Sequence, residues 1–317
     1  MEISISKILL ISLSFLFAVA IFIAFILMYF WVNRQKQRYT PFTEDSLRLP
    51  GHSVRLDQSR LSDGLLLLYL QFIVAIVAIS YFLYFLKGPL RFILSATLIL
   101  YVFYLSREIW KNMLNIQKYV LGREGEEYTG QELNLLMRSG AFVFHDIPYK
   151  YGNIDHIVIG RNKIFTVETK GIRKPSSANN GSRESTVVFN GKTLKFPHKT
   201  IDYPVTQALR HAKYMSEIIE KKCGVNFPVV AVVALPGWFI QNDAKFQDIL
   251  VINPKRGKAL KNWLGELNDK ESRDKVVAHV ASVARSVDYG SGKTDPNASK
   301  KYDFWLNPRV KETKLGD

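Results

Sequence analysis

The chain has 317 residues, a formal net charge of +15, one cysteine and six histidines. The single cysteine excludes an intrachain disulfide and a cysteine-based zinc site, and the histidines form no HExxH pattern. Residues 1–106 hold nine of the 43 Lys and Arg and five of the 28 Asp and Glu residues, so the downstream part carries about +11. This excess suits a polyanion, either nucleic acid or anionic lipid headgroups, and a basic solvated surface explains it equally well.

Three apolar runs precede the charged part of the chain. Ile8 to Val32 is uncharged over 25 residues, which exceeds the roughly 20 that a bilayer-spanning helix needs and is too long for a cleaved signal peptide. Leu65 to Leu86 is a second run, and a shorter one follows the Lys-Gly-Pro turn at 87–89. We therefore predict membrane helices at about 8–32, 65–86 and 90–106. The last two form a hairpin that either spans the bilayer twice or enters and returns.

The distribution of basic residues predicts an orientation. The loop between the first two runs carries six of them: Arg34, Lys36, Arg38, Arg48, Arg55 and Arg60. The positive-inside rule puts this loop in the cytoplasm and the N-terminus outside, as in a multi-pass protein of the inner (cytoplasmic) membrane. Either form of the hairpin returns the chain to the cytoplasm. The apolar runs contain almost no ionisable residues, which argues against an ion channel but leaves a homo-oligomer or a partner membrane protein open.

The downstream part reads as an α/β domain with a mixed central sheet flanked by helices. The predicted helices cover residues 124–139, 204–222, 258–267 and 271–285, and the predicted strands include 141–147, 228–235, 249–252 and a hairpin around Asn190-Gly191. The resulting organisation is a membrane anchor at 1–106, a cytoplasmic domain at 107–287 and a flexible C-terminal tail at 288–317.

One predicted hairpin, GNIDHIVIGRNKIFTVETKG, carries charges among its apolar residues. If its turn is centred on Arg161-Asn162, Asp155 falls opposite Glu168, and Lys170 lies one step further on the same face as Glu168. Opposed carboxylates with Cβ atoms about 4.5–5.5 Å apart repel each other, and a divalent cation such as Mg²⁺ or Mn²⁺ would compensate. A surface ion cluster is the alternative, and a three-residue loop would break the pairing.

Two helices add polar residues to this picture. Glu126 stands near the start of a helix, where it could bind metal or simply stabilise the helix dipole. Gln207 and His211 share a helix face at a spacing of four residues. With Arg210 and Lys213 beside them, this face could contact a phosphate backbone, whereas a solvated polar face is the plainer interpretation.

Four motifs carry a family resemblance. The patterns G-x-x-G-E (122–126), I-D-H-I-V-I (154–159), V-E-T-K (167–170) and Y-P-V-T-Q-A-L-R-H (203–211) together resemble the nuclease-related domain, NERD. That domain is similar to the PD-(D/E)xK nuclease superfamily, so the resemblance implies a restriction-endonuclease-like fold. It covers about residues 118–255.

The resemblance also implies roles for individual residues. Asp155 and Glu168 match the metal-binding carboxylates, with the backbone carbonyl of Thr169 expected as a further ligand, and Lys170 matches the catalytic lysine. The helix residues of the family are matched by Glu126 and Gln207. The implied activity is phosphodiester hydrolysis assisted by Mg²⁺ or Mn²⁺, with DNA favoured as substrate. The predicted membrane anchor, and not the resemblance, suggests incoming foreign DNA as the source of that substrate. The alternative is a non-catalytic nucleic-acid-binding module tethered to the membrane.

Overall fold

The computed structural model describes most of the chain downstream of residue 45. The described ranges are 46–149, 152–175, 183–242, 249–256, 258–262, 264–267 and 269–285, with isolated positions at 24, 27, 28 and 31. The predicted first membrane helix at 8–32, apart from those positions, and the predicted tail at 288–317 lie outside them.

The chain divides into two compact units. One contains Leu67–Ile109, and the other joins Ser46–Leu66 to Trp110–Ser286. The stretch just before the second apolar run therefore packs with the downstream domain, although it precedes the boundary at residue 106 that the sequence suggested. The apolar stretch is an insertion into that domain along the sequence.

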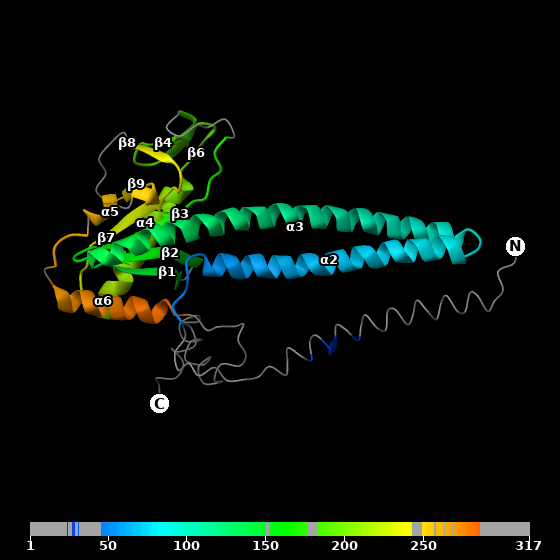
Figure 1. Cartoon of the computed structure of the whole chain (residues 1–317), viewed down its shortest axis with the longest axis horizontal. Helices are drawn as coiled ribbons and strands as arrows, with labels where there is room; N and C mark the ends of the chain where they lie inside the picture. The colour runs from blue at the N-terminus through cyan, green and yellow to red at the C-terminus, as the bar shows by residue number, and fades with distance from the viewer. Residues whose placement is uncertain are drawn as a thin grey trace. The chain divides into compact units, whose positions relative to one another are not determined.

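Two long helices contain the apolar insertion, α2 (His52–Phe85) and α3 (Leu90–Asn134), and Figure 1 shows the turn that joins them. Both are long and apolar enough to cross a membrane. Within the insertion, the Tyr101 hydroxyl donates to Gln71 Oε1 over 3.3 Å. Helix α3 continues without a break to Asn134, so the residues that follow the predicted membrane segment at 90–106 are helical as well.

The main sheet has five strands: β1 (Phe142–Tyr149), β2 (Gly152–Ile159), β3 (Ile164–Thr169), β7 (Val229–Ala234) and β9 (Ile249–Ile252). They lie in the order β1-β2-β3-β7-β9. The first three pair antiparallel, and β3, β7 and β9 pair parallel. The predicted mixed sheet is thereby confirmed.

A second sheet has the order β6-β5-β4-β8. Its strands are β4 (Thr186–Phe189), β5 (Leu194–Phe196), β6 (Lys199–Ile201) and β8 (Phe239–Asn242). The predicted hairpin joins β4 to β5, and the Asn190 side-chain oxygen accepts the backbone N–H groups of Lys192 and Thr193. Strands β6 and β8 were not predicted because they are too short to show a clear alternation of apolar and polar residues.

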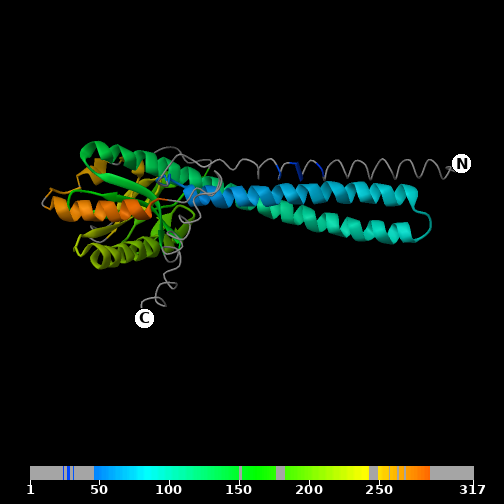
Figure 2. The same cartoon turned by 90° about the horizontal axis from the view of Figure 1, so that it is seen from below.

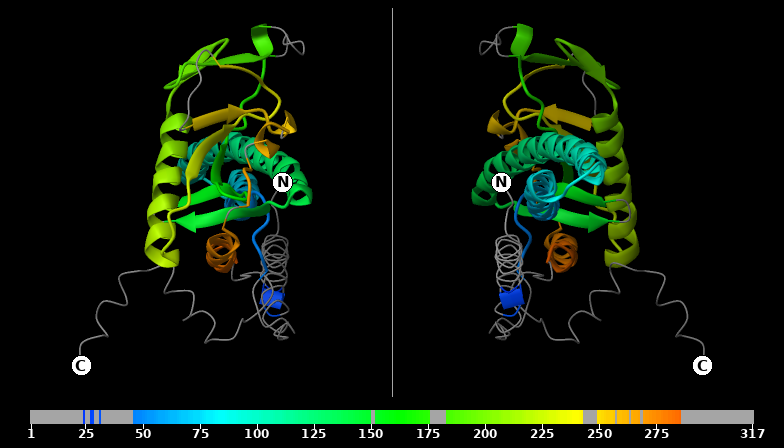
Figure 3. Two further views of the ribbon diagram at one scale, coloured as in Figure 1. Left: turned by 90° about the vertical axis from the view of Figure 1, so that its left-hand side faces the viewer. Right: turned by 90° about the vertical axis from the view of Figure 1, so that its right-hand side faces the viewer.

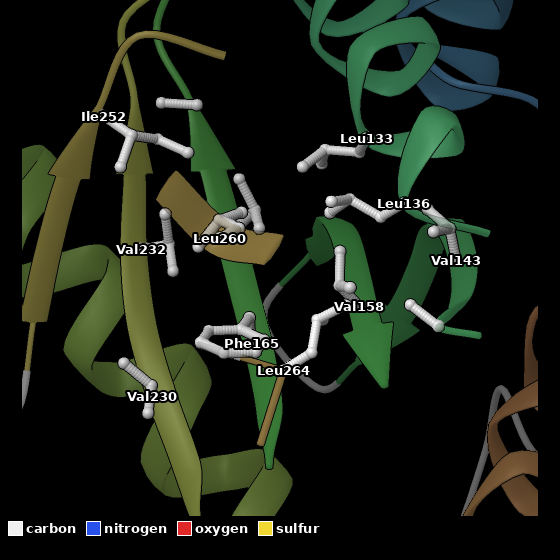
Figure 4. Close-up of a cluster of buried hydrophobic side chains, with 13 residues drawn as sticks. Leu133, Leu136, Val143, Val158, Phe165, Val230, Val232, Ile252, Leu260 and Leu264 are labelled. Atoms are coloured by element: carbon white, nitrogen blue, oxygen red, sulfur yellow. The ribbon is translucent and has the colours of Figure 1, made fainter. Parts of the chain in front are cut away.

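One face of the main sheet is covered by the end of α3 with the 3₁₀ turn Leu135–Ser139, and by the short α5 (Lys258–Lys261). Leu133 and Leu136 point toward the strands in Figure 4, and they belong to the same core cluster as Phe165 of β3. Gly140, in the left-handed conformation at φ 83°, ends this helical segment as predicted.

The opposite face is covered by α4 (Tyr203–Cys223) and α6 (Lys270–Val283), which Figures 2 and 3 show beside the strands. Met215 of α4 and Val280 of α6 pack on Ile157 of β2. Short 3₁₀ turns at Arg183–Ser185 and Pro254–Arg256 complete the described helices. The sheet between two helical layers fulfils the predicted architecture.

The helix α3 approaches the end of β3 so closely that Gly171 leaves no room for a side chain and Gly125 leaves little. A Cβ atom added to Gly171 would lie 2.6 Å from the Leu121 carbonyl oxygen, and one added to Gly125 would lie 3.3 Å from the Gly171 Cα. By contrast, a Cβ atom on Gly122 of the same helix would meet nothing within 4 Å. This contact brings Glu126 next to the end of β3.

We expect Gly171→Ala to lower the stability of the chain by about 1–3 kcal/mol, because the backbone carbonyl it would meet cannot turn away as a side chain could. Gly122→Ala is the matched control, and it should raise helix stability by roughly 0.5–1 kcal/mol. Thermal unfolding of the full chain in detergent measures both. Equal melting temperatures for the two variants would contradict the close approach.

Candidate functional site

The charged hairpin has the predicted register. His156 pairs with Val167, Ile157 with Thr166, and the ladder continues to Ile159 and Ile164. The Gly160 N–H donates to the Lys163 carbonyl over 2.8 Å, which closes a two-residue turn at Arg161-Asn162. One step further from the turn than the His156–Val167 pair, this register sets Asp155 opposite Glu168.

The regular backbone hydrogen bonding between β2 and β3 is interrupted at Asp155 and Glu168. The Thr169 N–H donates to Asp155 Oδ2 over 2.6 Å, so a side chain takes the place that a backbone carbonyl would have in a regular ladder. This hydrogen bond fixes the Asp155 carboxylate against the last residue of β3. Asp155 is half-buried, whereas only 1% of the Glu168 side chain is exposed.

Lys170 follows on the same face. Its Nζ lies 2.6 Å from Glu168 Oε1, and it also lies over the Tyr203 ring at 5.4 Å from the centroid. Burial alone would lower the pKa of Lys170, but the Glu168 carboxylate outweighs it and raises that pKa above the ordinary value. Lys170 is therefore a fixed positive charge at neutral pH.

The helix α4 brings His211 into the site. Its Nδ1 lies 3.3 Å from Glu168 Oε2, and its Nε2 lies 3.1 Å from the Tyr149 hydroxyl. Burial, with the positive charges of Arg210 and Lys170, lowers the pKa of His211 to about 4, so the ring is neutral at physiological pH.

The structure divides the predicted basic face of α4. Arg210 and Lys213 are exposed, but His211 is fully buried and does not lie on that surface. The helical spacing was correct, and the error arose because the sheet, which the spacing cannot place, covers this side of the helix. Gln207, one turn before His211, is half-buried.

Glu126 reaches the same end of the sheet from α3, and its side chain is buried. Burial raises the pKa of Glu126 to about 8, and the negative charges of Asp146 and Glu168 act in the same direction. Burial and the charges of Glu168 and Glu126 raise the pKa of Asp155 well above its ordinary value. The pKa of Glu168 is also raised by burial, although Lys170 opposes this. The carboxylates therefore hold protons more tightly than in water.

Asp146, which the sequence analysis missed, belongs to this group of acids. It is buried in β1, and Arg48 Nη1 lies 3.0 Å from its Oδ2. Behind it, His145 Nδ1 lies 2.9 Å from His156 Nδ1, and burial lowers the pKa of both rings. No local pattern marks Asp146, because its partner Arg48 is 98 residues away.

The donor set fits a hard divalent cation, although it is sparse. Within the described ranges, no group of three or more His, Cys, Asp or Glu side chains is arranged to hold a metal ion. Glu168 Oε2 is buried, and although His211 Nδ1 lies 3.3 Å away, the two atoms are not aligned as a hydrogen bond. Mg²⁺ commonly binds through one or two carboxylates, with water and phosphate oxygens completing its shell. Asp155 and Glu168 can supply that number.

Comparison with known families identifies the part of the chain that carries this site. Residues 121–236 match the family described as nuclease-related domain, NERD. The matched segment begins before Glu126 and extends past α4, so it contains every residue of the site that the sequence motifs suggested. No curated protein and no solved structure matches the chain.

The raised pKa of Glu126 predicts a loss of stability with rising pH. Between the ordinary value of 4.5 and about 8, the unfolded chain ionises this group while the folded chain keeps it protonated. Histidines whose pKa is lowered in the folded chain change the pH dependence of stability only below about pH 6.5. Between about pH 6.5 and pH 8 they therefore do not contribute to it. We expect stability to fall by about 2 kcal/mol over this range from Glu126 alone.

Chemical unfolding in detergent and chelator, at pH 6.5 and at pH 8, measures this loss. Asp155 and Glu168 contribute in the same direction, so the quantity of interest is the difference between the wild type and Glu126→Gln. The variant should lose about 2 kcal/mol less than the wild type. Parallel pH dependence in the two proteins would show that Glu126 is already ionised.

Proposed function

We propose that this chain, whose residues 121–236 form a nuclease-related domain, is a metal-dependent nuclease that hydrolyses phosphodiester bonds, with DNA as its substrate. The observation that carries the proposal is an imbalance of charge around the hairpin. Asp146, Asp155, Glu168 and Glu126 meet there, while Arg48 pairs with Asp146 and Lys170 with Glu168. Two paired cations and the exposed Arg210 therefore face four acids, and His211 is neutral.

This imbalance favours binding of a divalent cation. Keeping several buried carboxylates ionised is costly unless positive charge is supplied. Asp155 and Glu168 would hold the ion, and the backbone carbonyl of Thr169 is the third proposed ligand. The bound metal would supply a polarised phosphate and a water of lowered pKa. Mg²⁺ or Mn²⁺ suits these oxygen ligands.

The side chains of the chain itself have separate tasks in this proposal. Lys170 donates to Glu168 Oε1 and presents a positive charge that would offset charge developing on the phosphate. His211, with the Tyr149 hydroxyl behind it, lies against the other side of Glu168. Glu126, with a pKa of about 8, can carry or release a proton near neutral pH. Gln207 is placed one turn from His211, where it could contact the substrate.

The location is also part of the proposal. Many apolar side chains of α2 and α3 are exposed, among them Leu100 and Phe103, each 70% exposed. Exposure of this kind is typical of lipid contact and not of a helix buried in a soluble core. We propose that these helices anchor the chain in the cytoplasmic membrane with the nuclease-related domain in the cytoplasm. Incoming foreign DNA would be met there.

A non-catalytic nucleic-acid-binding module is the second candidate. The sparse donor set of the described residues favours it, since only two carboxylates are placed to share an ion. Such a module would bind DNA through its basic surface and would need no metal. Chelator and Asp155→Asn would then leave its salt-dependent binding unchanged.

Cleavage of DNA by the solubilised full chain tests the catalytic proposal. With Mg²⁺, we expect Lys170→Ala and Asp155→Asn each to reduce the rate by roughly 100-fold or more, because each removes charge stabilisation at the reacting phosphate. Lys221→Ala, at the exposed far end of α4, is the matched control and should cleave like the wild type. Wild type and Lys170→Ala that are equally inert across metals and substrates would contradict it.

Salt dependence of DNA binding tests the basic face of α4. With Ca²⁺ in place of Mg²⁺ to prevent cleavage, Arg210→Gln and Lys213→Gln should each reduce the slope of log K against log salt by about 1. Both side chains are exposed near the site. Lys221→Gln should leave the slope unchanged. An unchanged slope in the first two variants would place the nucleic acid on another surface.

A further inference from the structure

The backbone of Asp146 has an uncommon conformation. Among the described residues, it is the one non-glycine residue with a positive φ, at 52°. Its side chain is 1% exposed. A left-handed backbone and a buried carboxylate are both unfavourable unless neighbouring groups compensate. This residue is therefore held in place by its surroundings.

Arg48 and Ser53 provide this compensation. Arg48 Nη1 lies 3.0 Å from Asp146 Oδ2 and also donates to the Asp146 backbone carbonyl over 3.2 Å. The Ser53 hydroxyl donates to the other carboxylate oxygen. The same arginine thus neutralises the side chain and binds the backbone of the distorted residue.

Arg48 is itself fixed by the segment that carries it, residues 46–53, which we call the strap. The Arg48 N–H donates to the Ala284 carbonyl at the end of α6 over 2.9 Å, and Leu47 forms a β-bridge with Arg285. Pro50 lies so close to Gly130 of α3 that a Cβ atom there would overlap it. The strap therefore joins α6, β1 and α3 within one compact unit.

Asp146 faces Asp155 across the β1–β2 ladder. His145 pairs with His156 and Ile147 with Ile154, so Asp146 and Asp155 occupy the position between these pairs. The alternation of side chains shifts in both strands at this level. Phe144 and Ile147 enter the same core, and so do Ile154 and Ile157, although regular strands would send each pair to opposite faces.

We propose that the Arg48–Asp146 ion pair is a positioning element of the nuclease site, acting through the paired distortion of β1 and β2 that aims the Asp155 carboxylate at the Thr169 N–H. The inference rests on the proposed function for its catalytic consequence. It also adds Arg48 to the residues on which the site depends, and Arg48 precedes both the apolar insertion and the matched segment at 121–236. Loss of the pair would let Asp155 turn away from Thr169.

The first measurement needs no activity. Hydrogen exchange of the Thr169 amide, in the metal-free full chain in detergent, reports the bond to Asp155 directly. We expect Arg48→Ala to raise this exchange rate roughly 10-fold or more, and Arg48→Lys to restore part of the protection. Arg60→Ala removes an exposed ion pair with Asp57 on the same helix and should leave exchange unchanged.

The second measurement is cleavage against Mg²⁺ concentration. A displaced Asp155 should lower the rate per folded molecule by roughly 10- to 100-fold and raise the Mg²⁺ concentration needed for half-maximal rate. The double variant Arg48→Ala/Asp146→Asn leaves no unpaired buried charge, so it should recover thermal stability relative to Arg48→Ala. It should still show the raised Mg²⁺ requirement, which a merely structural role would not produce.

The outcomes separate the two proposals. An inert wild type whose Thr169 exchange still rises in Arg48→Ala would overturn the nuclease proposal and keep the positioning of Asp155. If the wild type is active, and neither Arg48→Ala nor Asp146→Asn changes the Thr169 exchange rate or the Mg²⁺ requirement, the positioning role is overturned.

Discussion

The burial of several neighbouring carboxylates is the constraint on which the rest of this site depends. Asp146, Glu168 and Glu126 are buried, and Asp155 stands between them. Burial raises the pKa of Glu126, Asp155 and Glu168, so keeping these groups ionised requires a compensating cation. Two such cations come from segments far apart in the sequence, Arg48 from before the apolar insertion and Lys170 from directly after β3. The remaining negative charge makes a divalent ion chemically reasonable at this point.

Close packing allows these charges to meet. The glycines at the contact of α3 with the end of β3 let a helix backbone approach a strand backbone, which puts Glu126 within reach of Glu168. On the other side, the neutral ring of His211 fills the space between α4 and Glu168 without adding charge. A charged histidine there would compete with a metal ion. The low pKa imposed by burial therefore suits a cation site.

The proposed membrane anchor and the site share two helices. One compact unit contains Ser46–Leu66 and Trp110–Ser286, so the apolar helices are inserted into it and do not simply precede it. Both ends of the insertion continue into helices that also contribute to the domain, α2 through Ser53 and α3 through Glu126. Insertion of the apolar stretch into a bilayer would thus restrain two elements that touch the acids.

The sequence by itself determined the register of the charged hairpin, because a two-residue turn and the alternation of side chains are local properties. It also identified the mixed sheet, α4 and the nuclease-related segment. Only the tertiary structure decided the partner of Asp146, the burial of His211 and the uninterrupted length of α3. Arg48 and Asp146 are far apart in the chain, and helical spacing cannot reveal which face a sheet will cover. Contacts between distant segments, set by packing, completed the site.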